Sequence, residues 1–389
     1  MTKPAHYGDY QLRIYRNGLK GERPRLPMRI EDMEAAARAV LPDESYWYVA
    51  GGAGESTMRA NREAFERYQI LPRMMTDVST RDVSIRLLGR DYPTPLLMAP
   101  IGVQSIIRPD AELAVARAAA RLGVPMILST VAAHSLEAVA EAMGDAPRWF
   151  QLYWPKSDAL AESLVKRAEA NGYQAIVVTL DTKMMAWRER DLANAFLPFL
   201  KGEGLANYTS DPVFRAGLEA TPEEDMWPSI RRWGEEFADP SKTWQDLAKL
   251  RQATSLPILL KGVLSPTDAA LAKEHGVDGL IVSNHGGRQV DGSIAALDAL
   301  APVRAAVGEH LPVLFDSGIR SGADILKAKA LGADAVLLGR PYIWGLALAG
   351  EEGVHEVLRR ILADLDLSMA LAGSDRFDAI DSDLLALGN

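Results

Sequence analysis

Asp278-Gly279-Leu280-Ile281-Val282 is a short apolar run, and Ser283-Asn284-His285-Gly286-Gly287-Arg288-Gln289 follows it directly. Apolar runs of this length are typical of buried parallel strands. The two glycines lack Cβ atoms, so backbone and ligand can approach closely at this turn. Histidine can accept a proton near neutral pH, and arginine can bind a carboxylate through two parallel hydrogen bonds. The stretch therefore predicts a strand end suited to chemistry beside the carboxylate of an organic acid.

Seven further apolar runs accompany this one, and amphipathic segments lie between most of them. Eight strand–helix units in series favour a closed (β/α)8 TIM barrel of the α/β class. An open doubly wound sheet is the alternative, but it usually has fewer strands and a G-x-G-x-x-G turn, which is missing here. The predicted strands are 96–100, 125–129, 148–153, 175–181, 257–261, 278–283, 312–316 and 335–339.

Two segments do not fit the strand–helix repeat. The N-terminal part contains a predicted helix over 30–39 and a hairpin over 83–95 that is expected to cover the bottom of the barrel. A long insertion follows the fourth strand, where such loops are usually lids or binding elements. Its aromatic residues could also form a small core of their own. The predicted single domain, 1–389, comprises an extension (1–91), a barrel (92–372) with the insertion (183–242), and a C-terminal tail (373–389).

The amino-acid composition limits the classes of protein to which the chain can belong. The chain has 389 residues, of which 48% are hydrophobic and 24% charged, as is ordinary for a globular protein. Its net charge of −9 and the lack of a long basic run give no support for binding nucleic acid or an anionic membrane. The absence of cysteine excludes disulfides, zinc–thiolate sites, iron–sulfur clusters and cysteine nucleophiles. Residues 1–7 lack the apolar core of a signal peptide, so a cytoplasmic enzyme without a metal is expected.

Polar side chains recur where six of the predicted strands end. Barrel enzymes place their chemistry at the C-terminal ends of the strands. Each residue alone could cap a helix or form a structural pair, but all six strand ends together favour a functional site. The strand-end residues are Gln151 and Tyr153, Thr179 and Asp181, Lys261, His285, Asp316, and Arg340.

Glycines and arginines follow the last two strands, at Gly318, Arg320, Gly339 and Arg340. Barrels commonly hold a phosphate at this place, through backbone N–H groups at a helix start. Ordinary glycine turns with surface arginines are the alternative. The pattern favours a phosphate-bearing cofactor, and Lys261 could then place a positive charge near a ring that accumulates electrons.

Taken in order, these residues resemble the FMN-dependent α-hydroxy acid oxidising enzymes, a family that includes glycolate oxidase, lactate oxidase and mandelate dehydrogenase. The similarity covers nearly the whole chain and is highly specific. It implies a TIM barrel, FMN as cofactor and a small 2-hydroxy acid as substrate. The segments that carry it are 48–52, 99–102, 151–153, 179–181, 261–262, 283–289, 316–320 and 339–341.

The resemblance implies roles for the residues around the substrate. His285 would be the base that takes a proton from the substrate, and Asp181 would orient it and stabilise its charged form. Arg188 and Arg288 would hold the substrate carboxylate, with help from Tyr48. Tyr153 would form a hydrogen bond near the substrate hydroxyl or carboxylate. From spacing alone, Arg188 could equally be a solvated loop charge.

The resemblance also implies a set of residues around FMN. Lys261 would stabilise negative charge on the ring, and Asp316 would meet the ribityl chain. Arg320, Gly339 and Arg340 would lie at the phosphate. The remaining implied FMN-binding residues are Pro100, Ile101, Gly102, Ser129, Gln151, Thr179, Ser283 and Gly318.

Within the family, the insertion after Arg188 is most similar to that of lactate 2-monooxygenase. This implies oxidation of L-lactate by molecular oxygen to acetate, carbon dioxide and water. An oxidase that releases the keto acid and hydrogen peroxide, a dehydrogenase with another acceptor, a flavin-dependent isomerase and a non-catalytic barrel are the alternatives. The family further implies a homotetramer or homo-octamer.

Two positions beside the implied flavin site affect substrate size. Val131 stands where several short-chain oxidases have an aromatic residue, which leaves room for a different substrate side chain. Gly102 stands where several oxidases have alanine, so it could enlarge the space for oxygen or substrate, or simply form a tight turn. One methylene in an apolar pocket separates substrates by only about 1–3 kcal/mol, so a 2-hydroxy acid is the expectation and L-lactate the example.

Overall fold

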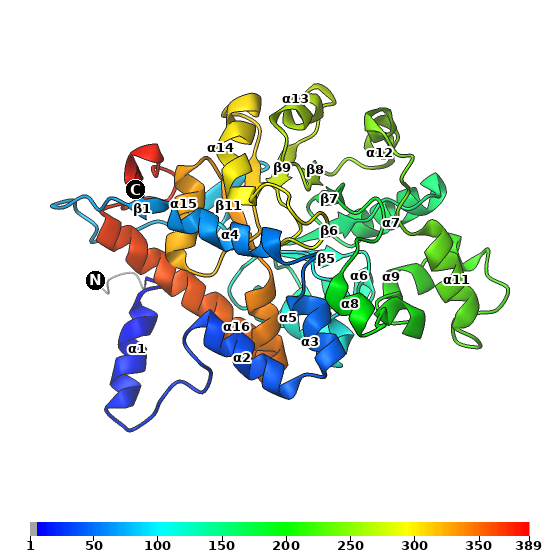
Figure 1. The fold of residues 1–389 in the computed structure, drawn as a ribbon, viewed down its shortest axis with the longest axis horizontal. Helices are drawn as coiled ribbons and strands as arrows, with labels where there is room; N and C mark the ends of the chain where they lie inside the picture. The colour runs from blue at the N-terminus through cyan, green and yellow to red at the C-terminus, as the bar shows by residue number, and fades with distance from the viewer. Residues whose placement is uncertain (1–5, 389) are drawn as a thin grey trace.

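Eight parallel strands close into a barrel in the computed structural model, which describes residues 6–388 (Figure 1). Each strand pairs with its neighbours in chain order, and the last strand pairs with the first. The predicted TIM barrel is therefore confirmed, and the open sheet is excluded. Residues 1–5 and 389, at the ends of the predicted extension and tail, lie outside the described range. The strands are β4 (Leu96–Met98), β5 (Met126–Ser129), β6 (Arg148–Leu152), β7 (Ile176–Thr179), β8 (Ile258–Lys261), β9 (Gly279–Val282), β10 (Val313–Phe315) and β11 (Ala335–Leu338).

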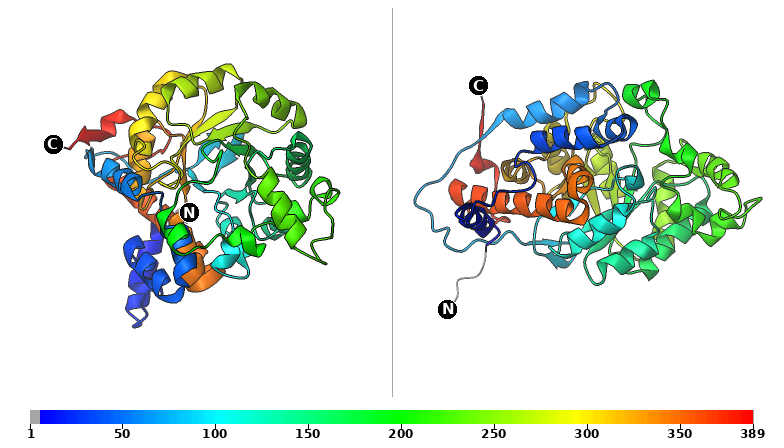
Figure 2. Two further views of the ribbon diagram at one scale, coloured as in Figure 1. Left: turned by 45° about the vertical axis from the view of Figure 1, so that its right-hand side comes forward. Right: turned by 90° about the horizontal axis from the view of Figure 1, so that it is seen from below.

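A helix follows each barrel strand, and together the helices form the outer layer seen in Figure 2. The strands read as continuous apolar runs because they are covered on both faces, and every residue of β5, β7, β8 and β9 is buried. The last helix is kinked at Ala349 and Gly350. The barrel helices are α5 (Ala111–Ala120), α6 (Leu136–Met143), α7 (Asp158–Ala170), α12 (Leu247–Ala253), α13 (Pro266–Glu274), α14 (Ala296–Val307), α15 (Gly322–Ala330) and α16 (Arg340–Ala372).

The N-terminal extension is more helical than the sequence predicts. The expected helix is present as α2 (Ile30–Val40), which packs against α16. Three further helices, α1 (Asp9–Gly18), α3 (Asp43–Ala50) and α4 (Ser56–Glu66), were not predicted. Helix α1 projects from the body of the molecule in Figure 1. By contrast, α3 and α4 lie against the site, as described below.

The predicted hairpin forms from β2 (Ile85–Leu87) and β3 (Arg90–Tyr92), which pair antiparallel. Trp149, near the start of β6, donates a hydrogen bond to the hydroxyl of Tyr92 at 3.3 Å. That hydroxyl donates in turn to Gln174, just before β7, at 3.0 Å. The hairpin therefore packs against the N-terminal ends of the strands, away from the predicted site. A second small sheet joins β1 (Tyr68–Ile70) to β12 (Leu385–Leu387) near the C-terminus.

The insertion between β7 and α12 consists mainly of short helices. They are α8 (Glu189–Ala193), α9 (Ala206–Thr209), α10 (Pro212–Arg215) and α11 (Trp227–Glu236), together with 3-10 turns at Pro198–Lys201 and Trp244–Asp246. Helix α11 lies at the right edge of Figure 1, outside the ring of barrel helices.

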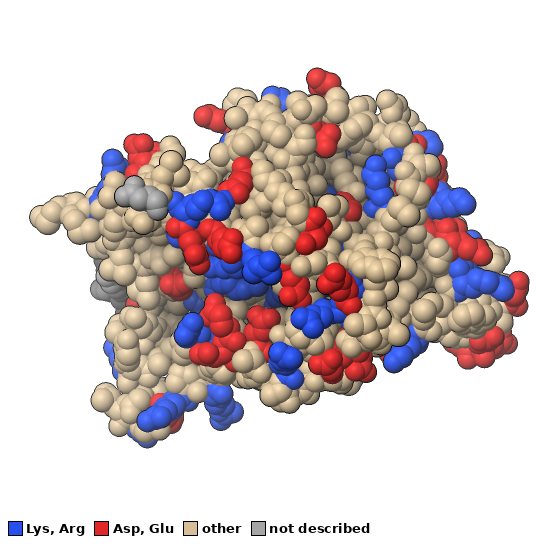
Figure 3. Space-filling model, viewed as in Figure 1, with Lys and Arg blue, Asp and Glu red and all other residues tan. Residues whose placement is uncertain are grey.

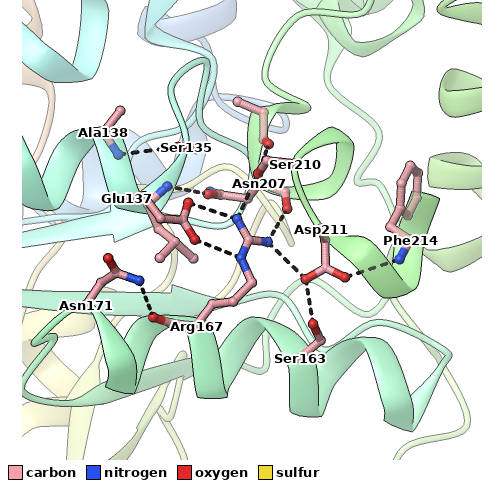
Figure 4. Close-up of polar contacts among 12 residues, drawn as sticks. Ser135, Glu137, Ala138, Ser163, Arg167, Asn171, Asn207, Ser210, Asp211 and Phe214 are labelled. Atoms are coloured by element: carbon pink, nitrogen blue, oxygen red, sulfur yellow. Dashed lines mark hydrogen bonds and ion pairs between the residues drawn. The ribbon is translucent and has the colours of Figure 1, made fainter. Parts of the chain in front are cut away.

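Arg167 on α7 joins the insertion to the barrel (Figure 4). Its guanidinium donates to both carboxylate oxygens of Glu137 on α6, each at 2.9 Å. The same group donates to the insertion, at Asp211 Oδ2 (2.9 Å) and Ser210 Oγ (2.7 Å). The side chain of Asp211 is fully buried, so its charge needs such a partner. This part of the insertion is therefore fixed to the outer helices.

Asn207 extends that attachment to the barrel strands. Its side-chain amide donates to the carbonyl oxygens of Ser129 (3.2 Å) and Thr130 (3.0 Å), at the end of β5. Its carbonyl oxygen accepts from the backbone N–H of Leu136 at 2.7 Å. One buried side chain thus fixes α9 to the rim of the barrel.

Charged side chains of both signs are interspersed over the face of the molecule shown in Figure 3. Within residues 6–388, no helix combines the length and the apolar character needed to cross a lipid bilayer.

Candidate active site

A cavity of about 630 Å³ opens where the barrel strands end, within the size range typical of small-molecule and cofactor sites. Most of the predicted site residues line it. They are Tyr48, Pro100, Ile101, Gly102, Tyr153, Arg188, Lys261, His285, Arg288, Asp316, Gly318, Arg320, Gly339 and Arg340. The insertion adds Met185, Ala186, Trp187, Asp191, Leu192, Phe196 and Phe199 to the lining.

Five predicted site residues do not line the cavity. Asp181 contacts His285, and Ser283 contacts Lys261, so both act on the cavity through a lining residue. The hydroxyl of Ser129 donates to Gln151 at 3.1 Å. Thr179 is buried at the end of β7.

His285 and Asp181 form a hydrogen-bonded pair between the ends of β9 and β7. The Nδ1 atom of His285 lies 2.8 Å from Asp181 Oδ1. Burial lowers the pKa of His285 below its ordinary value of 6.5, although Asp181 acts in the opposite direction. Burial alone would raise the pKa of Asp181, but His285 and Lys261 outweigh it and hold the value at about 2. At neutral pH the pair is therefore a neutral imidazole oriented by an ionised carboxylate.

The backbone at His285 is strained, with φ at 59°, a conformation that side chains with a Cβ rarely adopt. Two serine hydroxyls stabilise this backbone conformation. Ser283 Oγ accepts from the N–H of His285 at 3.0 Å, and Ser317 Oγ accepts from the N–H of Gly286 at 3.0 Å. The turn is thus fixed from its own strand and from β10.

Helix α4 of the N-terminal extension supports the same turn. The side-chain amides of Asn61 and Asn284 exchange two hydrogen bonds, at 2.8 and 2.7 Å. The carbonyl oxygen of Asn284 also accepts from the N–H of Gly287 at 3.0 Å. Asn61 was not predicted, because nothing in its local sequence distinguishes it from a surface asparagine on a helix.

Three half-buried arginines face the cavity without an ion-pair partner among residues 6–388. Arg340 donates to the carbonyl oxygens of Val49 (2.9 Å), Gly286 (3.0 Å) and Gly51 (3.1 Å). Arg288 donates to the carbonyl oxygen of Gly51 at 2.6 Å, and Arg320 to that of Ile319 at 3.0 Å.

The electrostatics of these arginines favour an anionic ligand. Burial, followed by repulsion from neighbouring arginines, lowers the pKa of Arg340 to about 9 and that of Arg288 to about 10. Burial and the nearby Arg62 also lower the pKa of Arg320. Buried cations without acidic partners are costly unless a ligand supplies the negative charge.

Arg188 points into the site. Its side chain is only 17% exposed, so the alternative of a solvated loop charge is wrong. It donates to the carbonyl oxygen of Arg288 at 3.2 Å and to the side chain of Gln289 at 3.0 Å. The ring of Tyr48, on α3, lies 5.4 Å from the guanidinium of Arg288. Arg188, Arg288 and Tyr48 therefore share one side of the cavity.

The pocket residues fit a phosphate-bearing cofactor with a polar ring such as FMN. Gln151 Nε2 and Thr179 Oγ1 are buried without a hydrogen-bond partner within residues 6–388, as expected for atoms that bind a ligand. Lys261 Nζ donates to Ser283 at 2.8 Å and lies 3.4 Å from Asp316 Oδ2. Arg320 and Arg340 also line the cavity and carry the positive charge that a phosphate would need. No group of three or more His, Asp or Glu side chains in the described chain is placed to bind a metal.

Gly102 leaves no extra space for oxygen or substrate. A Cβ built at this position would lie 2.5 Å from a methyl of Val131 and 2.6 Å from its carbonyl oxygen. That carbonyl accepts from the N–H of Val103 at 2.8 Å, so two chain segments pass very close together here. The idea that glycine enlarges the pocket is therefore wrong, and close backbone approach explains it.

The aromatic residues of the insertion are divided between a core and the mouth of the cavity. Phe199, Tyr208, Phe214 and Trp233 are buried, whereas Trp187 and Trp227 are largely exposed. The core is continuous with the site. The ring of Phe199 lies 4.4 Å from that of Trp233, Trp233 lies 4.9 Å from Phe237, and Phe237 lies 5.3 Å from Tyr153. The insertion therefore forms one wall of the cavity.

A model of the FMN-dependent dehydrogenase family matches residues 37–387. The chain belongs to this family. An L-lactate oxidase of Lysinibacillus sphaericus is 47% identical over 91% of each chain. The FMN-dependent alpha-hydroxy acid dehydrogenase qulF of Penicillium citrinum is 45% identical over 95% of this chain and 93% of its own. A crystal structure of mandelate oxidase superposes with a TM-score of 0.83 at 40% identity, over 93% of this chain and 99% of that one.

Family membership confirms the predicted cofactor and the class of reaction. The protein is an FMN-dependent oxidoreductase that oxidises α-hydroxy acids. The flavin-isomerase and non-catalytic alternatives are thereby set aside. Which acid it oxidises, and what becomes of the product, belong to the proposal below.

Proposed function

We propose that this FMN-dependent dehydrogenase oxidises L-lactate, or a similar short L-2-hydroxy acid, with molecular oxygen. The proposed products from lactate and one oxygen molecule are acetate, carbon dioxide and water. Arg188 and Arg288 would bind the substrate carboxylate, with Tyr48 and Tyr153 beside them. Bound FMN would supply the chemistry of accepting two electrons from the substrate.

The placement of the base supports the oxidation step. Because Asp181 engages Nδ1 of His285, the other ring nitrogen of His285 is left to take a proton from the substrate. Asp181 remains ionised and stabilises the imidazolium that forms. The carboxylate clamp is on the same loop through Arg288, three residues further along the chain.

The wall formed by the insertion is the observation that supports decarboxylation. Residues of α8 and the aromatic cluster line the cavity, so the keto acid product would leave past them. Slow release would keep the keto acid in place while oxygen reacts, since closed sites often make product release rate-limiting. Mobility of this wall as a lid is part of the proposal.

Release of the keto acid together with hydrogen peroxide is the second candidate. It is favoured by the similarity to proteins described as L-lactate oxidases, from Lysinibacillus sphaericus and from Nostoc. A dehydrogenase that uses another electron acceptor is favoured by the similarity to qulF.

Spectroscopy of the purified enzyme tests the proposal. L-lactate without air should bleach the visible flavin band, whereas D-lactate should leave it unchanged. On admission of air, acetate and carbon dioxide should form in proportion to the lactate consumed. Stoichiometric peroxide and pyruvate would instead establish the second candidate. A flavin that no 2-hydroxy acid bleaches would contradict both.

The rate of flavin reduction should fall only in moderately acidic solution. The base must be neutral to accept a proton, and burial shifts the pKa of His285 below 6.5. Lowering the pH through this value protonates the base, so the rate constant should stay level above pH 6.5 and decline below it. Anaerobic reduction measured from pH 5 to 9 in one buffer series checks this. A decline that already begins above pH 7 would contradict the proposed state of His285.

The cytoplasmic location and the homotetrameric or homo-octameric assembly stay predictions. The proposed roles of Pro100, Ile101, Gly102, Ser129, Gln151, Thr179 and Gly318 around FMN also stay predictions. So do those of Lys261, Ser283, Asp316, Arg320, Gly339 and Arg340.

A further inference from the structure

Gln289 occupies a central position that the proposed reaction leaves without a role. It is the last residue of the 283–289 turn, and its side chain is half-buried behind the cavity. The side-chain amide donates to the carbonyl oxygen of Asp181 at 2.7 Å and to Thr182 Oγ1 at 2.9 Å. Its own carbonyl oxygen accepts from Arg188 at 3.0 Å. One side chain therefore contacts both the partner of the base and the carboxylate clamp.

The chemistry of a carboxamide suits both contacts at once. A guanidinium offers only donors and needs an acceptor, whereas a backbone carbonyl needs a donor. The carboxamide is the neutral group that presents both. Its donors also fix its orientation, because a flipped amide would place two oxygens, those of Gln289 and Asp181, against each other. A hydrocarbon of the same size would satisfy neither neighbour.

The contacts continue to the base. Thr182, which accepts from Gln289, donates its own hydroxyl proton to Asp181 Oδ1 at 2.9 Å. The same carboxylate oxygen lies 2.8 Å from His285. Arg188 and His285 are thus connected by an unbroken series of side-chain hydrogen bonds. The series runs from Arg188 through Gln289, Thr182 and Asp181 to His285. Arg188 also contacts the Arg288 backbone at 3.2 Å, Asp191 at 3.8 Å, and the hydroxyl of Tyr48.

We infer that Gln289 is a positioning residue that aligns the carboxylate clamp with the His285–Asp181 pair. This inference rests on the proposed function, because it assigns the clamp and the base to one substrate. Gln289 holds Arg188 in the direction of the carboxylate, and it holds the Asp181–Thr182 segment so that the imidazole faces the substrate α-carbon. Near-attack geometry is sensitive to such alignment, since a shift of 1 Å can cost about a hundredfold in rate.

Replacing Gln289 by leucine tests both halves of this role. Oxalate, a planar dicarboxylate with no hydrogen to lose, reports on the clamp through the change it causes in the flavin spectrum. We expect Gln289→Leu to weaken oxalate binding about tenfold and to slow anaerobic flavin reduction about tenfold, within the range of coupling between directly bonded residues. Val290→Ala, an exposed neighbour on the same turn, is the matched control and should change neither value more than about twofold.

A double-mutant cycle separates positioning from a general loosening of the turn. If Gln289 acts on oxalate through Arg188, then Gln289→Leu should weaken oxalate binding no further once Arg188→Met is present. The slower flavin reduction should persist in that background, because the contact with Asp181 is independent of Arg188. The inference would be overturned if the effects of Gln289→Leu and Arg188→Met on oxalate binding were fully additive. It would also be overturned if Gln289→Leu lost FMN while its flavin-loaded fraction bound oxalate and was reduced like wild type.

Oxalate binding also distinguishes failure of the inference from failure of the proposed function. If no 2-hydroxy acid bleaches the wild-type flavin but oxalate binds, the proposed reaction is wrong and the oxalate cycle alone decides the role of Gln289. If 2-hydroxy acids bleach the flavin and Gln289→Leu matches wild type in both measurements, the reaction stands and the inference falls. Absence of oxalate binding by a wild-type enzyme that is bleached normally would also overturn the clamp half of the inference.

Discussion

His285→Ala is expected to slow flavin reduction by a 2-hydroxy acid about 10²–10⁴-fold, the range associated with loss of a general acid–base group. The side chain contacts Asp181 and lines the cavity, so it is placed to accept a proton from a bound substrate. FMN should stay bound, because Arg320, Arg340 and the Gln151 and Thr179 atoms that lack a partner among residues 6–388 are unchanged. Anaerobic bleaching at saturating substrate measures the rate, and visible absorbance measures the bound flavin.

The control for this variant is His310→Ala, at an exposed histidine distant from the cavity. It should bleach at the wild-type rate. If His285→Ala were reduced as fast as wild type, His285 would not be the base. If it were purified without flavin, its effect would lie in cofactor binding, which the structure does not predict.

Arg288→Met is expected to raise the substrate concentration for half-maximal reduction at least about 30-fold. Truncating one partner of a buried, hydrogen-bonded charge pair typically costs 2–5 kcal/mol, and each 1.4 kcal/mol is a factor of ten. Arg288 is proposed as a clamp residue on the same turn as His285, and its guanidinium forms no ion pair with an acidic side chain among residues 6–388. The reduction rate at saturation should change less than the half-saturating concentration, since Nδ1 of His285 keeps its contact with Asp181.

Arg86→Met provides the matched control, because Arg86 is an exposed arginine on the hairpin at the opposite end of the barrel. This variant should leave the substrate concentration for half-maximal flavin reduction unchanged. An unchanged half-saturating concentration in Arg288→Met itself would mean that Arg188 alone binds the carboxylate. A wild-type half-saturating concentration together with a lower maximal rate of flavin reduction would mean that Arg288 acts in the chemical step.

The barrel could be predicted from the sequence because buried parallel strands read as uninterrupted apolar runs. All eight predicted strands contain the observed ones, with ends that differ by at most two residues, as for β7 (Ile176–Thr179) within 175–181. Helices α1 and α4 were missed because most of their residues are polar, and α3 because it is short and has no clear apolar face. Helix α3, for example, mixes aromatic, acidic and small residues along eight positions.

The candidate site could be predicted where residues follow strand ends, and not where contacts join distant segments. His285, Arg288 and Lys261 follow directly from strands that the sequence reveals. Asn61, which supports the His285 turn, is separated from Asn284 by 223 residues, and no local pattern relates them. Asp191 offered a weak signal, since it lies three residues after Arg188 at the start of a helix, a spacing at which opposite charges meet.

Arg167 determines how far this enzyme can be treated as a scaffold with an exchangeable loop. The groups that it joins belong to α6, α7 and the insertion, and Asn207 adds the end of β5. A foreign loop spliced in after β7 would keep the Arg167–Glu137 pair but remove Asp211 and Ser210 from Arg167, and Asn207 from the Ser129 and Thr130 carbonyls. A transplant that keeps 205–215 and replaces only the preceding residues would preserve that set. The segment that can be exchanged without breaking these contacts is therefore shorter than the insertion, and it ends at Gly204.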